Sequence, residues 1–110
     1  MTGVAYMVER LTRHEAQAGA RGPQIRNAVA RRIGVTPGTV ENIRRNRLKF
    51  VERVEEKVRA AFIRLLEHEI SKATHELAIA RAASDRVDTP AVFAAEAALL
   101  QARQILQGVR

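Results

Sequence analysis

The stretch from Arg26 to Arg45 reads RNAVARRIGVTPGTVENIRR and carries the most informative pattern in the sequence. Its apolar residues recur in steps of three and four, the spacing of one helical face. Gly34 interrupts this pattern, and Thr36-Pro37 restarts it, because threonine caps helices and proline favours the first helical position. The stretch therefore predicts two short helices joined by a tight turn, the second spanning about residues 37–46.

The flanking segments also show helical spacing. An apolar face from Val4 to Ala18 predicts a first helix, and Gly22-Pro23 begins the next one. No glycine or proline occurs between Leu48 and Ala83, which predicts one long helix. Nothing alternates with period two, so the chain is predicted to be all-α.

The C-terminal part predicts a helical hairpin. A loop over Ser84–Asp88 reverses the chain, and Thr89 can cap a last helix that begins at Pro90 and runs to Gln107. Gly108 is predicted to lie just past the end of that helix. Two regions follow from this pattern: a tri-helical domain over residues 1–48 and a long helical hairpin over residues 49–110.

The positive charge is confined to one of these regions. The chain has 110 residues, with 19 Lys and Arg against 12 Asp and Glu, a net charge of +7. Up to Lys49 there are ten basic and three acidic residues, whereas the remaining residues carry nine of each. Such asymmetry indicates that the N-terminal part meets a polyanion and the C-terminal part does something else.

Several residues of the Arg26–Arg45 stretch fit the requirements of a helix-turn-helix. That motif needs a small residue where its helices cross, a turn residue tolerant of positive φ, and apolar residues that hold the second helix on the first. Ala30 and Gly34 supply the first two. The apolar set is Val29, Ile33, Val35, Val40 and Ile43.

Within this stretch the run Gly34-Val35-Thr36, then Thr39-Val40, then Ile43 resembles the helix-turn-helix of lactose-repressor-type bacterial and phage regulators. The resemblance covers about twenty residues directly, and the rest of the chain has no sugar-binding domain. It implies that the outer face of the helix over residues 37–46 enters the major groove of DNA.

The resemblance also implies the contacts. Pro37 and Gly38 depart from the polar readers usual at the start of such a helix, so base reading falls to Glu41, Asn42 and Arg45, which suit cytosine, adenine and guanine respectively. Residues that can donate to or neutralise phosphates are more numerous. They are Arg26, Asn27, Arg31, Arg32, Thr36, Thr39, Arg44, Arg47 and Lys49.

The last helix favours self-association. Only Glu96 and Arg103 are charged between Pro90 and Gln107, and apolar residues cover more of the circumference than one hairpin partner can bury. We therefore expect a homodimer through the helices at residues 49–84 and 90–107. A monomer in which the last helix folds back under the tri-helical domain is the alternative.

Other function classes lack the residues they need. Cysteine is absent, His68 and His75 fit solvated helix surface, and no glycine-rich phosphate cradle or activated nucleophile is present, so no enzyme, metal site, cofactor or small-molecule ligand is expected. The few aromatic residues stand outside the basic cluster, which disfavours single-stranded nucleic acid. A membrane span needs about 20 predominantly apolar residues, and the sequence has no such run.

The sequence therefore predicts a cytoplasmic, nucleoid-associated regulator of transcription that binds double-stranded DNA as a homodimer. Two alternatives stay open. A DNA-binding head followed by a helical oligomerisation hairpin also resembles a phage terminase small subunit, which would form a larger ring. A helical adaptor that binds proteins and not DNA is the third reading.

Overall fold

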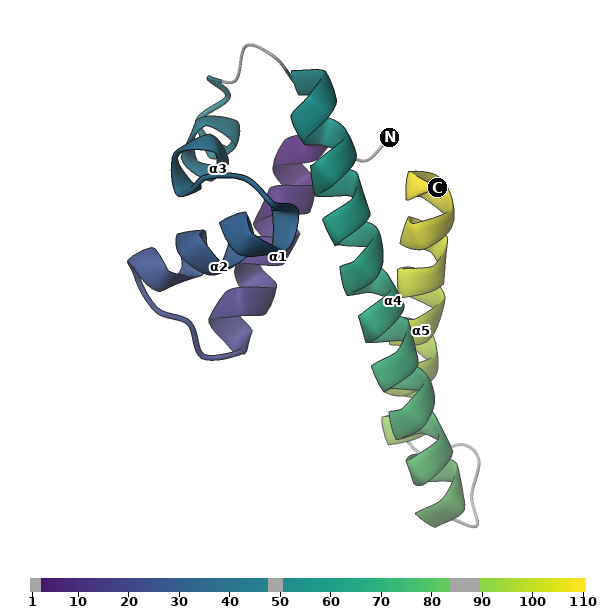
Figure 1. Cartoon of the computed structure of the whole chain (residues 1–110). Helices are drawn as coiled ribbons and strands as arrows, with labels where there is room; N and C mark the ends of the chain where they lie inside the picture. Colours follow the sequence, from purple (N-terminus) through teal and green to yellow (C-terminus); the bar gives the residue numbers. More distant parts are fainter. Residues whose placement is uncertain (1–2, 48–50, 84–89) are drawn as a thin grey trace. The chain divides into compact units, whose positions relative to one another are not determined.

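The computed structural model describes residues 3–47, 51–83 and 90–110, and this part of the chain is helical, with no strand (Figure 1). The predicted all-α class is confirmed. The helices are α1 (Val4–Gln17), α2 (Pro23–Ile33), α3 (Pro37–Arg44), α4 (Val51–Ala83) and α5 (Pro90–Val109). Leu48, Lys49, the expected loop at Ser84–Asp88 and the expected cap Thr89 lie outside the described residues.

The turn between α2 and α3 has the local chemistry that the sequence predicts. Gly34 has a φ of 86°, a conformation that costs glycine little, and the Val35 N–H donates to the Ala30 carbonyl at 3.0 Å. Thr36 caps α3, because its hydroxyl oxygen accepts a hydrogen bond from the Thr39 N–H at 3.3 Å. The stop at Gly34 and the cap at Thr36 are confirmed.

The end of α3 uses asparagine where glycine is more usual. Asn46 has a φ of 56°, and the Arg47 N–H returns to the Asn42 carbonyl at 2.8 Å. Asparagine tolerates this left-handed conformation better than most residues. Because Asn46 has a left-handed conformation, the helix does not continue through it. The helix α3 ends at Arg44, two residues short of the expected end.

The chain divides into two compact units, Met1–Phe62 and Ile63–Arg110. In the first unit, α1, α2 and α3 contact one another and the first turns of α4 join them. Phe62 is fully buried with its ring edge-on to Tyr6 at 6.1 Å, and the Lys57 ammonium donates to the Gly34 carbonyl at 3.5 Å. The other buried apolar residues of this unit are Met7, Val8, Leu11, Val29, Ala30, Ile33, Val40, Ile43, Val58 and Ala61.

The boundary between the two compact units lies inside α4. The glycine-free run after residue 48 suggested that the tri-helical domain stops there, whereas the first compact unit continues to Phe62. Val58, Ala61 and Phe62 of α4 are buried and belong to the core of this unit. The first turns of α4 are thus a fourth structural element of the N-terminal unit.

The second unit is an antiparallel pair formed by α5 and the remainder of α4 (Figure 1). Leu77, Val92 and Leu99 form one buried cluster in this unit. Ion pairs join the two helices toward either end, Arg81 to Glu96 at 2.7 Å and Arg110 to Glu67 at 3.7 Å. These pairs fix the register of α5 on α4.

The position of Gly108 differs from the prediction. It lies within α5, which ends at Val109, so the expectation that Gly108 follows the end of the helix is wrong. Val109 is buried, and the Arg110 N–H donates to the Leu106 carbonyl at 3.0 Å. Packing of Val109 therefore carries the helix past a glycine that would otherwise favour its end.

Candidate nucleic-acid interface

One face of α3 combines exposure with the residue types that read bases. Gly38, Asn42 and Arg45 follow one another in steps of four and three residues, so they share a face, and all three are exposed. Val40 and Ile43 are buried on the opposite side. The amide of Asn42 has no hydrogen bond to any part of the chain that the structure describes, and it is free to meet a partner.

Glu41 occupies a different position from the other expected base readers. Its carboxylate accepts a hydrogen bond from the Arg45 Nε at 2.8 Å and lies 3.9 Å from an Arg26 guanidinium nitrogen of α2. Glu41 is only partly exposed, and the Arg26 Nε is buried. Its carboxylate therefore ties α3 to α2 and orients the Arg45 side chain on the exposed face.

Arg32, expected at a phosphate, pairs with an acidic residue of α1. Its Nε donates to the carboxylate of Glu15, and Glu15 is only 8% exposed. Glu15 is not among the residues expected at the site, although it stands four residues after the buried Leu11 and so continues the apolar face of α1. A buried carboxylate requires a partner, and Arg32 supplies it.

Three of the arginines that are expected to contact phosphates have no acidic partner among the described residues. Arg31, Arg44 and Arg47 are exposed and make no ion pair with the described residues. Arg44 belongs to the last turn of α3, and Arg47 follows the left-handed residue that ends it. Unpaired guanidinium groups at such positions are suited to bidentate binding of phosphate oxygens.

The remaining expected phosphate donors lie at two places. The hydroxyls of Thr36 and Thr39 are 2.9 Å apart at the start of α3, so one hydrogen bond already engages both. Asn27 is exposed on α2 and, with Gln24 and Arg31, lines a hollow beside the end of α1. Lys49 lies outside the described residues.

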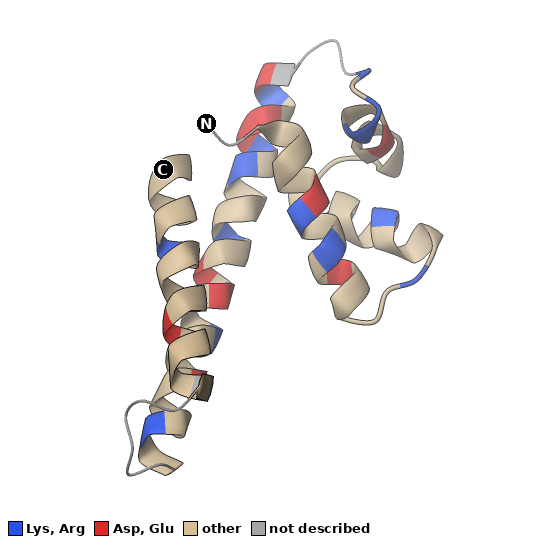
Figure 2. Cartoon of the chain, turned by 180° about the vertical axis from the view of Figure 1, so that it is seen from behind, with Lys and Arg blue, Asp and Glu red and all other residues tan. Residues whose placement is uncertain are grey.

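The basic residues of the chain are concentrated in the first unit, which also contains the candidate interface. Basic residues recur in the first unit, whereas α5 is almost entirely uncharged (Figure 2). The charged residues of α5 are Glu96 and Arg103. Within residues 3–47, 51–83 and 90–110, no three His, Asp or Glu side chains gather as metal ligands, and no helix is long and apolar enough to cross a membrane.

No protein-family model, curated protein or solved structure matches this chain.

Proposed function

We propose that the protein is a regulator of transcription that binds double-stranded DNA as a homodimer, with α2 and α3 as a helix-turn-helix and α3 as the recognition helix. The observation that carries the proposal is the exposed α3 face of Gly38, Asn42 and Arg45, with the unpaired guanidinium groups of Arg44 and Arg47 beside it. An exposed polar face on one helix suits the major groove of B-DNA.

The proposed contacts are of two kinds: contacts to phosphates position the protein on DNA, and contacts to bases read the sequence. Arg31, Arg44 and Arg47 neutralise phosphates, because their charges are not balanced within the described residues. Asn42 pairs with adenine, and Arg45 pairs with guanine from the orientation that Glu41 gives it. Glu41 itself acts through Arg45, since its carboxylate is already engaged by two guanidinium groups.

Two such units in a dimer would read a pseudo-palindromic site. Their recognition helices would then lie about 34–36 Å apart, one turn of DNA. With only two side chains per unit that read bases, most of the affinity comes from phosphates and a smaller part from sequence. The size of the oligomer separates this proposal from a packaging ring, and DNA affinity separates it from a protein-binding adaptor.

Gly38 offers a test of the recognition face. A Cβ at Gly38 would meet only the Thr36 hydroxyl oxygen, at 3.9 Å, so a larger side chain fits the folded protein. We expect Gly38→Leu to leave the melting temperature unchanged or slightly higher, because leucine favours helices more than glycine does. Affinity for duplex DNA should fall about tenfold or more, equivalent to about 1.4 kcal/mol, because the side chain holds α3 away from the groove.

Gly108→Leu is the matched control. Gly108 is also an exposed helical glycine with open space around it, but it lies in α5. We expect this variant to keep the DNA affinity of the wild type. Fluorescence anisotropy with a labelled duplex measures both variants, and equal affinities for them would refute α3 as the recognition helix.

A further inference from the structure

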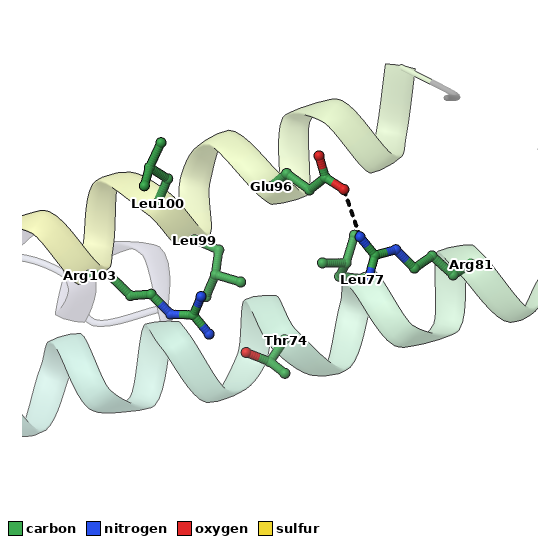
Figure 3. A pocket seen from close by; sticks show the side chains of 7 residues that line it. All are labelled: Thr74, Leu77, Arg81, Glu96, Leu99, Leu100 and Arg103. Carbon is green, nitrogen blue, oxygen red and sulfur yellow. Dashed lines mark hydrogen bonds and ion pairs between the residues drawn. The ribbon is translucent and has the colours of Figure 1, made fainter. Parts of the chain in front are cut away.

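The hairpin of the second unit has a groove on one side. It is lined by Thr74, Leu77 and Arg81 of α4 and by Glu96, Leu99, Leu100 and Arg103 of α5 (Figure 3). Leu100 is 59% exposed and points away from α4, and Phe93, seven residues earlier on α5, is 57% exposed. An isolated hairpin therefore leaves two large apolar side chains in water on the same side of α5.

Two charged residues flank the exposed leucine. Glu96 and Arg103 are the charged residues of α5, and both line the groove. One oxygen of Glu96 accepts a hydrogen bond from Arg81 at 2.7 Å, whereas Arg103 has no ion pair to the residues that the structure describes. They are seven residues apart, about 10 Å along the helix, with Leu99 and Leu100 midway between them.

We infer that a second copy of the chain occupies this groove, with its α5 antiparallel to the first. A two-fold axis that passes beside Leu99 and Leu100 places Glu96 of each copy opposite Arg103 of the other. The same axis brings the two Leu100 side chains together. Each guanidinium of Arg103 then gains a carboxylate, and the two hairpins form a four-helix arrangement around the leucines.

The charges favour a second copy over a different partner. Residues 63–110 carry six acidic and six basic residues, so two such units meet without net repulsion. The acidic and basic residues of α5 stand symmetrically about Leu99 and Leu100, which makes the surface complementary to itself in the antiparallel orientation. Burial of Phe93 and Leu100 supplies the apolar contribution to association.

Two single charge reversals test the pairing. In a dimer of Arg103→Glu, the new carboxylate of each copy faces Glu96 of the other copy. In a dimer of Glu96→Arg, the new guanidinium group of each copy faces Arg103 of the other copy. Each variant alone should dimerise at least about tenfold more weakly than the wild type, because like charges that face each other across an interface are unfavourable. Arg103→Glu leaves the Arg81–Glu96 pair intact, and circular dichroism checks that both variants stay helical.

Mixing the two variants decides the question. A heterodimer of Arg103→Glu with Glu96→Arg has opposite charges at both positions, so native mass spectrometry should show the heterodimer in excess over either homodimer. A monomeric wild type, a ring of higher order, or a mixture without preference for the heterodimer would overturn the inference. The measurement uses no DNA, so its outcome is independent of the proposed DNA binding.

Discussion

Replacing Arg31, Arg44 and Arg47 together by alanine should lower affinity for duplex DNA on the order of a hundredfold at about 0.1 M salt. These guanidinium groups have no ion pair within the described part of the chain, so their loss removes phosphate contacts without breaking an internal bridge. The slope of log affinity against log salt should become shallower by about 2 to 3, since each neutralised phosphate contributes about 0.9.

A second triple variant controls for net charge. Arg59, Arg64 and Lys72 lie on α4, and their replacement by alanine removes the same three positive charges from positions outside the proposed interface. We expect this variant to bind DNA within a few-fold of the wild type. If both triples weakened binding equally, affinity would follow total charge, and the assignment of α2 and α3 as the interface would fail.

Phe62→Ala should destabilise the first unit by about 3–5 kcal/mol, the usual cost of removing a buried phenylalanine. Phe62 is fully buried and packs edge-on against Tyr6, although it lies in α4, beyond the expected end of the domain at residue 48. Its loss opens a cavity in the core that holds α1 to α3. Thermal unfolding followed by circular dichroism measures the effect.

Ile79→Ala serves as the control for shortening an apolar side chain on α4. Ile79 is 55% exposed on the same helix, so its replacement should change stability by no more than about 0.5 kcal/mol. A Phe62→Ala variant as stable as Ile79→Ala would show that the first turns of α4 contribute little to the N-terminal unit.

Features set by local chemistry could be predicted from the sequence. Gly34 ends α2 because glycine accommodates a positive φ, and Thr36 caps α3 because its hydroxyl reaches the Thr39 N–H, so neighbours along the chain suffice for both. The end of α5 could not be placed in this way. Val109 is buried, and its burial depends on tertiary packing, which local residue preferences at Gly108 do not encode.

The candidate site was harder to predict because its charges interact across helices. Arg32 and Arg26 looked like phosphate contacts in the sequence, but the first pairs with Glu15 of α1 and the second approaches Glu41 of α3. Both pairs join residues on different helices, so they follow from how the helices pack. Arg31, Arg44 and Arg47 make no ion pair with the described residues, and this distinction is visible only once the helices are in place.

The salt dependence of DNA binding is the most direct test of the proposed function. An anisotropy titration of the intact protein with a mixed-sequence duplex, repeated from about 50 to 200 mM NaCl, gives the slope of log affinity against log salt. With Arg31, Arg44 and Arg47 on phosphates, we expect a slope of about −2 to −3 per protomer. A slope near zero, or no binding at the lowest salt, would contradict a DNA-binding function.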